Sequence, residues 1–97
     1  MKKVASETGA SYQVTFEVPA ESHAQIAFLC GDFNNWDTQS LPMKQRKDGS
    51  FTKKMTLKSG NSYRFRYLLD GERWENAWDA DAYVPNDFGS EDSVVDV

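Results

Sequence analysis

The fold is decided by Tyr63-Arg-Phe-Arg-Tyr-Leu-Leu-Asp-Gly71, a stretch in the second half of this 97-residue sequence. Aromatic or aliphatic side chains stand at every second position from Tyr63 to Leu69, and two arginines lie between them. A period of two with one apolar face is typical of a half-buried β-strand. The strand runs into Asp70-Gly71, a pair that favours a hairpin turn because both residues tolerate a positive φ. The stretch therefore predicts a strand that ends in a tight hairpin, with its odd-numbered side chains in the core.

Further strands are predicted on both sides of this one. Their ranges are Tyr12–Val18, Gln25–Cys30, Phe51–Leu57 and Ser93–Val97. The first and third alternate like the stretch above, whereas the second is apolar at nearly every position and so fits a central strand. Asp48-Gly49 predicts a second hairpin turn, with both residues at positive φ, and Ser59-Gly60-Asn61 predicts another turn. The spacing of strands and turns is that of an all-β sandwich.

We therefore expect an all-β fold, an antiparallel β-sandwich that forms one domain over residues 10–97. Residues 1–9 are small and polar, and we expect them to be a flexible N-terminus. The acidic and aromatic stretch Trp74–Gly89 has no clear period, which predicts a long loop, and loops of this length are usually functional. No window has the apolar stripe of an amphipathic helix.

Composition narrows the classes of function. The net charge is −4, so the sequence lacks the basic stripe of a nucleic-acid-binding protein. No stretch has transmembrane length and no secretory signal is visible, so we expect no membrane partner and a cytoplasmic location. The single cysteine, Cys30, excludes an internal disulfide and gives no zinc site; a buried, inert thiol is expected. His23 stands alone in a polar turn and is expected at the surface, and no cofactor or metal is predicted.

A candidate site begins at Gly31-Asp-Phe-Asn-Asn-Trp36, directly after an apolar run. Its Gly, Asp and Asn residues favour a turn, which places Trp36 at the edge of a strand. There it either caps the core or offers a flat apolar face to a ligand. Trp74 and the segment 78–90 are expected to converge on the same region. Aromatic faces beside paired polar groups suit a sugar, which has an apolar C–H face and a ring of hydroxyls; the polar candidates are Asn35, Arg66, Asn76 and Asp92.

Together these motifs resemble the family 48 carbohydrate-binding modules. The residues that carry the resemblance are Gly31–Trp36, Tyr63–Gly71, Trp74, Phe88-Gly-Ser90 and Val94-Val95, and it covers about Val14 to Val97. The family is the early-set, immunoglobulin-like domain of glycogen-branching and debranching enzymes, and the glycogen-binding domain of the AMP-activated protein kinase beta subunit. The resemblance implies an immunoglobulin-like early-set sandwich that binds α-1,4-glucans such as glycogen and starch fragments.

The resemblance also implies roles for individual residues. In the family two tryptophans stack on the glucan, and Trp36 and Trp74 match them; this chain has one extra residue before Trp74, so Trp78 is the alternative second platform. Arg66 stands where the kinase-subunit domains have a hydrogen-bonding lysine. Phe88, next to Ser90, matches a bulky residue that presses into the curve of the glucan. Asp92 falls near a family asparagine, but an ionised Asp accepts hydrogen bonds without donating them.

Alternatives remain beside this reading. The fold can serve as a protein-interaction or regulatory module without sugar binding, and an accessory domain associated with glycoside hydrolase activity is a third reading. The acidic residues are Asp79, Asp81, Asp87, Glu91 and Asp92. They invite a calcium site or a glycosidase carboxylate pair, but a solvated acidic face is the simpler interpretation. We expect a non-catalytic module whose partners are an α-glucan and an enzyme or regulatory protein.

Overall fold

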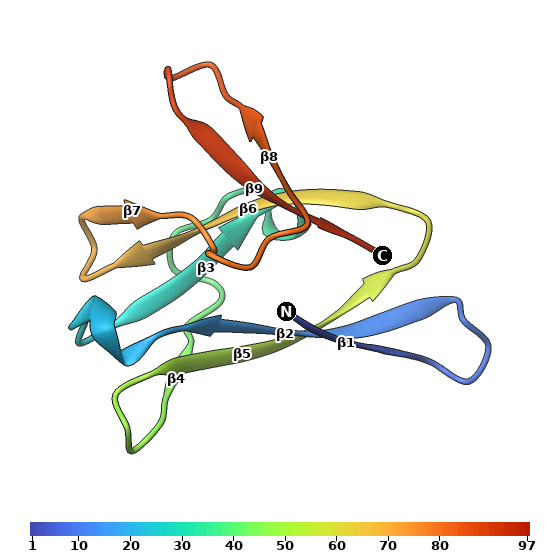
Figure 1. Cartoon of the computed structure of the whole chain (residues 1–97), viewed down its shortest axis with the longest axis horizontal. Coiled ribbons are helices and arrows are strands. Elements are labelled where there is room, and N and C mark those ends of the chain that lie inside the picture. Colours follow the sequence, from blue (N-terminus) through green and yellow to red (C-terminus); the bar gives the residue numbers. More distant parts are fainter.

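Two antiparallel sheets make up the β-sandwich, as the computed structural model of residues 1–97 shows (Figure 1). The strands of the first sheet run in the order β1-β2-β5-β4 and those of the second in the order β3-β6-β9-β8, with β7 also paired to β6. Their bounds are β1 Lys2–Ala5, β2 Ser11–Val18, β3 Ala27–Gly31, β4 Lys44–Gln45, β5 Phe51–Lys58, β6 Ser62–Leu69, β7 Arg73–Glu75, β8 Ala82–Pro85 and β9 Glu91–Asp96. The predicted all-β sandwich is confirmed.

The helical part of the chain consists of two 3-10 turns, η1 Ala20–Ser22 and η2 Asp32–Asn34. No helix has the length and apolar character needed to cross a membrane.

The core lies between the sheets and is built by the predicted alternation. On β6 the odd-numbered residues Phe65, Tyr67 and Leu69 are buried, whereas Arg64 is exposed on the opposite face. Phe65 meets Phe16 of the other sheet edge to face, with ring centroids 4.9 Å apart at 73°. Burying a side chain of this size stabilises the fold by about 2–3 kcal/mol. This burial fixes which face of β6 points outward.

Two neighbours share one edge of β6, and this arrangement creates the site. The first half of β6 pairs with β9, through Ser62↔Asp96 to Phe65↔Ser93. The second half pairs with β7, through Tyr67↔Glu75 to Leu69↔Arg73. Strand β3 pairs along the other edge, with Gly31 opposite Phe65, and it ends the sheet, so the prediction of a central strand was wrong; the segment 41–43 covers its free edge. Residues from four strands therefore gather on the outer face of this sheet.

Strands β1, β4, β7 and β8 differ from the prediction. Residues 1–9 were expected to be frayed, yet Lys2–Ala5 forms β1, paired with β2 from Lys2↔Thr15 to Ala5↔Tyr12. Trp74–Gly89 was expected to be a loop, yet it contains most of β7 and all of β8. These strands are two to four residues long, too short to show a period, and pairing with neighbours holds them in place.

The two predicted hairpin turns have different geometry. Asp70 and Gly71 have φ values of 53° and 73°, as expected for a turn with two left-handed residues. At Asp48-Gly49 only Gly49 is left-handed, with φ of 93°, so that part of the prediction was wrong. The Asp48 carboxylate instead accepts hydrogen bonds from the backbone N–H and hydroxyl of Ser50, at 2.9 and 2.6 Å. These bonds hold the pKa of Asp48 below its usual range.

Cys30 is buried, as predicted. Burial, together with the negative charge of Asp37, raises its pKa to about 11. The thiol is therefore protonated at neutral pH, and a protonated thiol is a poor nucleophile.

Candidate functional site

The turn that follows β3 is built by its asparagines. Asn34 accepts a hydrogen bond from the backbone N–H of Gly31 at 2.9 Å, and its amide donates to the carbonyl of Asp37 and the hydroxyl of Ser40, at 3.1 and 2.9 Å. Asn35 has φ of 55°, a left-handed conformation that asparagine tolerates better than most residues. The chain reverses here over a few residues and presents Trp36 on the outer face of the β3-β6-β9-β8 sheet.

Trp36 is held in one orientation by Asp32. The indole N–H donates to one carboxylate oxygen of Asp32 at 3.0 Å, and the other oxygen accepts the backbone N–H of Arg64 at 2.8 Å. One carboxylate thus ties the indole to β6. The side chain is half-buried, and it is not among the residues packed against the core cluster between the sheets. Part of the indole therefore faces solvent, and its contact with a ligand stays a prediction.

Gly31 allows the turn to approach β6 closely. A Cβ atom at this position would lie 2.5 Å from the carbonyl oxygen of Arg64 and 2.9 Å from the Cβ of Phe65. Its φ of −173° is extended backbone, so space and not conformational freedom requires glycine here. The glycine therefore sets the distance between the Trp36 turn and the arginines of β6.

Trp74 and Arg66 form the second aromatic element. Trp74 pairs with Leu68 across the β6–β7 ladder, so its side chain projects from the same face as Arg66. The Arg66 guanidinium carbon lies 5.8 Å from the centre of the Trp74 ring, within cation–π range. The Nε of Arg66 is buried without a hydrogen-bond partner. An unpartnered buried donor is costly, so this atom favours a ligand or water that can accept from it.

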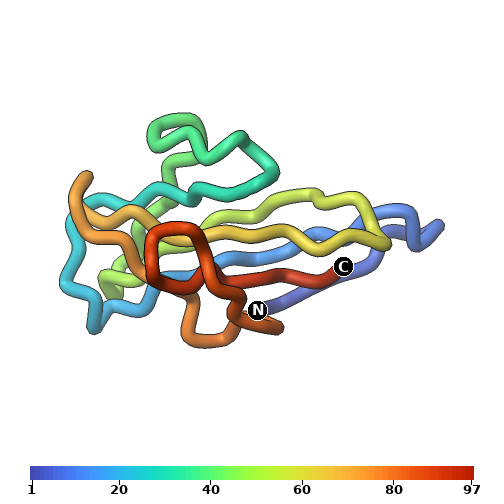
Figure 2. Tube along the Cα trace, turned by 90° about the horizontal axis from the view of Figure 1, so that it is seen from above, coloured from blue at the N-terminus to red at the C-terminus, as the bar shows by residue number.

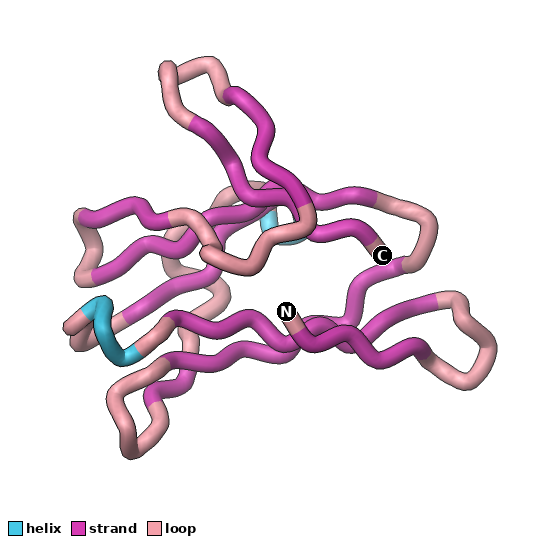
Figure 3. Tube along the Cα trace, viewed as in Figure 1, coloured by secondary structure: helices cyan, strands magenta, loops and turns pink.

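A projecting hairpin forms the wall of the site. Figure 3 shows the far part of the β8–β9 hairpin projecting from the rest of the sandwich, with a loop at the tip. Asn86 organises this tip, because its side-chain oxygen accepts the backbone N–H groups of Phe88 and Ser90, at 2.9 and 3.2 Å. Gly89 takes the left-handed position with φ of 78°. The result is that Phe88, which is 91% exposed, is presented to solvent at the tip.

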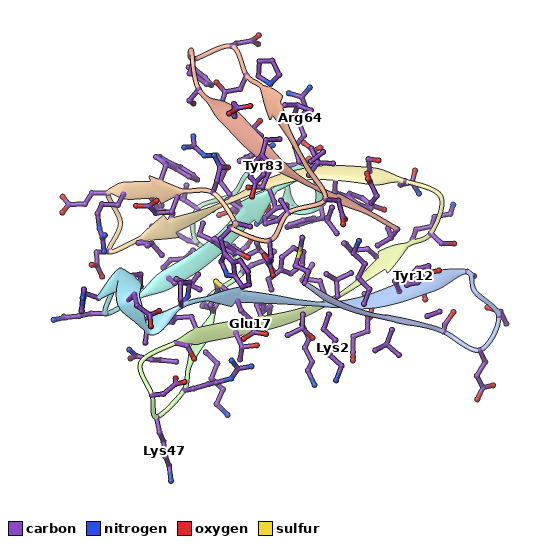
Figure 4. The ribbon with its side chains drawn as sticks, viewed as in Figure 1. Lys2, Tyr12, Glu17, Lys47, Arg64 and Tyr83 are labelled. Atoms are coloured by element: carbon purple, nitrogen blue, oxygen red, sulfur yellow. The ribbon has the colours of Figure 1, made fainter.

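Asp92 connects the wall to the floor of the site. It is 7% exposed, and one of its oxygens accepts the amide of Asn86 at 3.0 Å. The other oxygen lies 3.8 Å from a guanidinium nitrogen of Arg64. Figure 4 shows Arg64 close to β8, at the side of the hairpin. Asp92 therefore supports the hairpin and the Arg64 side chain at once.

These elements enclose a cleft of about 610 Å³, which we call the outer cleft. Its lining consists of Asp32, Trp36, Arg64, Arg66, Trp74, Asn86, Asp87, Phe88 and Asp92. Of the seven site residues predicted from sequence, the structure brings five together here. Asn35 and Ser90 do not line the cleft. Asn35 shapes the turn, and Ser90 donates hydrogen bonds from its backbone N–H and its hydroxyl to the side-chain oxygen of Asn86.

Four lining residues were missed by sequence reasoning. Asp32 and Arg64 were overlooked although each lies within a quoted motif, because their role depends on the contact between β3's turn and β6. Asn86 and Asp87 precede Phe88-Gly-Ser90. An Asn before a short Gly-containing loop often bonds through its side chain to the loop backbone, and this signal could have identified Asn86 from the sequence.

The structure separates Trp74 from Trp78. Trp78 is 75% exposed and lines a different cleft, while Trp74 shares the outer cleft with Trp36. Figure 2 shows the turn after β3 at the top and the segment around residue 78 at the bottom, on opposite sides of the β8–β9 hairpin. Asn76 also lies away from the outer cleft, and its side chain bonds to the Glu91 carbonyl and the Ser93 hydroxyl.

The acidic residues after Trp78 do not gather at one point. Asp81 pairs with Lys3, and Asp92 pairs with Arg64 and Asn86. No group of three or more His, Cys, Asp or Glu side chains is arranged to hold a metal ion. His23 is exposed in a turn after η1.

Comparison with known proteins agrees with the fold. The model of carbohydrate-binding module 48, the isoamylase N-terminal domain, matches residues 5–84. The chain is also similar to the 1,4-alpha-glucan branching enzyme GlgB of Aquifex aeolicus (strain VF5), with 39% identity over 62 residues. That segment is 63% of this chain and 10% of the enzyme. The family match includes Trp36, Arg66 and Trp74, whereas Phe88, Ser90 and Asp92 lie beyond it.

Proposed function

We propose, because the chain belongs to the carbohydrate-binding module 48 family, that its outer cleft binds an α-1,4-linked glucan without cleaving it. The observation that carries this proposal is the placement of Trp36 and Trp74 in one cleft with two arginines. Each indole offers an apolar plane to a sugar face, and the guanidinium groups donate to sugar hydroxyls.

Arg66 is the principal donor in this proposal. Its Nε lacks a partner and its guanidinium lies against Trp74, so a hydroxyl of a sugar stacked on that ring would come within reach. Arg64 supplies a second donor from the same face of β6. Phe88, at the tip of the hairpin, adds an apolar contact along the glucan.

The carboxylates of the cleft support binding without catalysis. Glycoside cleavage uses two carboxyl groups, one to donate a proton and one to act as base or nucleophile. Asp32 uses both oxygens for Trp36 and the Arg64 backbone, and Asp92 uses both for Asn86 and Arg64. Asp87 is then the one carboxylate of the lining without a hydrogen bond from a neighbour. A single free carboxylate at a hairpin tip does not make a catalytic pair.

The expected affinity is weak. A sugar face on a tryptophan removes about 100 Å² of apolar surface from water, which is worth ~2.5 kcal/mol. Two platforms give ~5 kcal/mol, and association costs at least ~4 kcal/mol. With several hydrogen bonds the Kd is on the order of 10 μM to 1 mM. A polymer with many equivalent sites retains such a module through multivalency.

The relative is a branching enzyme, and 10% of it matches this chain. We extend the proposal accordingly: the module contributes glucan binding to an enzyme or regulatory protein with which it is associated. No cofactor takes part.

An NMR titration with maltoheptaose tests the proposal. Saturable shifts at the indole N–H signals of Trp36 and Trp74, with that of Trp78 unchanged, are the expected result. Cellohexaose, which has β-1,4 links and a straight shape, is the matched control and should give much smaller shifts. Absence of saturable shifts at ~10 mM maltoheptaose, well above the expected Kd, would contradict the proposal.

A further inference from the structure

A second cleft lies at the side of the sandwich, between the end of β2 and the β6–β7 hairpin. We call it the side cleft; its volume is about 350 Å³. Its lining consists of Glu17, Val18, Pro19, Glu21, Ser22, Tyr67, Leu69, Arg73, Glu75, Asn76 and Trp78. Because Tyr67 pairs with Glu75 and Leu69 with Arg73, these side chains project from the inner face of β6 and β7, opposite to the outer cleft.

Trp78 is the aromatic surface of the side cleft. It is 75% exposed, whereas Trp74 is 40% exposed. An exposed tryptophan keeps a large apolar face in water, and such residues are enriched where proteins contact partners. The core does not account for this side chain, which is absent from the packed cluster between the sheets.

Internal hydrogen bonds use the side chains of Asn76 and Arg73 in the side cleft. The amide of Asn76 donates to the Glu91 carbonyl, and its oxygen accepts from the Ser93 hydroxyl. Arg73 is the one cation of the lining, and it is directed to the Ser22 carbonyl at 3.1 Å and to the Asp70 carboxylate at 3.5 Å. The amide of Asn76 and the guanidinium of Arg73 are therefore engaged within the protein.

Acceptors remain free in the same cleft. Glu21 and Glu75 are exposed and form no hydrogen bond or ion pair with a neighbour, while Glu17 pairs with Arg46 at 2.8 Å. With three carboxylates against one arginine, the lining carries an excess of negative charge. Glu17 is labelled on β2 in Figure 4 and lines this cleft.

A buried hydroxyl points to a missing partner at this place. Tyr67 is 2% exposed, lines the side cleft, and its hydroxyl forms no hydrogen bond. Burial, with the charge of Asp79 nearby, raises its pKa far above the usual value, so the hydroxyl stays protonated. Buried polar groups in proteins are almost always paired, and an unpaired hydroxyl can accept a hydrogen bond from a bound water or ligand.

We propose that the side cleft binds the guanidinium group of an arginine from a protein partner. A guanidinium has five donors and no acceptor, which complements free carboxylates and an unpartnered hydroxyl. Its planar face stacks on an indole and gains a cation–π contact there. A sugar, in contrast, is uncharged and forms no ion pair with these carboxylates, and the amide and guanidinium donors of the cleft are engaged. This proposal is independent of glucan binding in the outer cleft.

Titration of the full chain with Nα-acetyl-arginine amide tests this proposal. We expect a saturable shift of the Trp78 indole N–H, with the Trp36 and Trp74 signals unchanged. Nα-acetyl-citrulline amide has the same shape without the charge, and it should bind at least ~10-fold more weakly, as expected from losing an ionised donor. The Glu75→Gln variant should weaken arginine binding several-fold, and added salt should weaken it further.

Three results would overturn the proposal. The first is equal binding of the citrulline and arginine probes. The second is a shift of the Trp78 indole N–H by the arginine probe that persists unchanged in the Glu75→Gln variant. The third is a saturable shift of Trp78 by maltoheptaose, which would make the side cleft a sugar site. Because the proposed glucan function is read from Trp36 and Trp74, its failure would be seen separately from any of these.

Discussion

The outer cleft and the side cleft contain the same kinds of residue but differ in which polar atoms are free. Both have a tryptophan, at least one arginine, an asparagine and several carboxylates. In the outer cleft the carboxylates of Asp32 and Asp92 are used internally, and Arg66 keeps an unpartnered donor. In the side cleft the amide of Asn76 and the guanidinium of Arg73 are used internally, and the carboxylates of Glu21 and Glu75 are free. Composition alone therefore does not define the ligand; the hydrogen bonds within the protein do.

One strand separates the two clefts. The even-numbered residues Arg64 and Arg66 of β6 face the outer cleft, and the odd-numbered residues Tyr67 and Leu69 face the core and the side cleft. Successive side chains of a strand point to opposite faces, so a shift of one residue in register would exchange them. Binding at one cleft can therefore be changed without touching the other, and the following predictions depend on that.

The largest expected effect comes from closing the space behind the Trp36 turn. Gly31→Ala places a methyl group 2.5 Å from a backbone oxygen, which forces the turn and β6 apart. We expect the free energy of unfolding to fall by about 3 kcal/mol, measured by urea denaturation. The control is Gly89→Ala in the hairpin tip, where the methyl group meets no atom within 4 Å and φ is 78°. Only left-handed strain acts there, so a loss of about 1 kcal/mol is expected. A smaller loss of unfolding free energy for Gly31→Ala than for Gly89→Ala would show that β3 and β6 are not so close at Gly31.

The sharpest test of the difference between the two clefts is to compare the Trp36→Ala and Trp78→Ala variants. Trp36→Ala removes one platform, ~2.5 kcal/mol of apolar contact, and should weaken maltoheptaose binding by ~70-fold in calorimetry. Trp78→Ala should leave maltoheptaose binding unchanged and abolish the response to the arginine probe. If Trp36→Ala unfolds the domain, the half-buried indole serves the core more than the ligand. In that case Trp74→Ala, at a more exposed position, is the variant to compare.

Removal of the Asp32 carboxylate tests whether the fixed orientation of Trp36 contributes to stability and to maltoheptaose binding. Asp32→Ala leaves the indole N–H and the Arg64 backbone N–H without their acceptor. We expect a loss of about 1 kcal/mol in stability and a several-fold weaker binding of maltoheptaose. Asp87→Ala is the matched control in the same cleft, because that carboxylate has no hydrogen bond to lose. Equal effects of the two variants would mean that the Asp32 bonds contribute nothing.

Tyr67→Phe tests the unpartnered hydroxyl of the side cleft. Because this hydroxyl forms no hydrogen bond, its removal should leave stability unchanged or raise it by up to about 1 kcal/mol. Tyr83→Phe is the comparison, since its hydroxyl donates to the Ala77 carbonyl and should cost about 1 kcal/mol when lost. Thermal unfolding measures both. A clear destabilisation by Tyr67→Phe would show that the hydroxyl has a partner within the protein.

The smallest effect concerns Asp70, which holds Arg73 at the rim of the side cleft. The backbone N–H groups of Gln25 and Ile26 bond to this carboxylate and lower its pKa. A carboxyl whose pKa is lower in the folded state stabilises the fold above its unfolded pKa of about 4, and this stabilisation is lost as pH falls through the folded pKa. We expect the stability of the Asp70→Asn variant to fall less steeply below about pH 4 than that of the unaltered protein. Parallel pH profiles from urea denaturation would contradict this expectation.

Long alternating segments were predictable from sequence, and short ones were not. The pattern of residues 63–69 was enough to place β6 and to divide its residues between two faces, because burial of every second side chain dominates the energy of such a strand. In β8, Ala82–Pro85, no residue is fully buried, so the sequence holds no such signal. Its position depends on pairing with β9, a contact that no local pattern encodes.

Part of the candidate site was predictable in the same way. Trp36, Arg66, Trp74, Phe88 and Asp92 were identified as residue types with the right chemistry, and the structure brings these five together. That they contact a glucan stays a prediction. The choice between Trp74 and Trp78 could not be made from sequence, since the two lie four residues apart and point to different clefts only after β7 pairs with β6.

The sequence by itself determined the all-β class, the alternation that builds the core, the turn before Trp36 and the family to which the chain belongs. These features follow from local residue types and their spacing. The tertiary structure decided which polar atoms are left free: Asp32 bonds across to β6, Arg73 to the Ser22 carbonyl and Asn76 to the Glu91 carbonyl. Such bonds join residues that are far apart in sequence and close in space. They decide what each cleft can bind because a hydrogen-bonding group already paired within the protein is no longer available to a ligand.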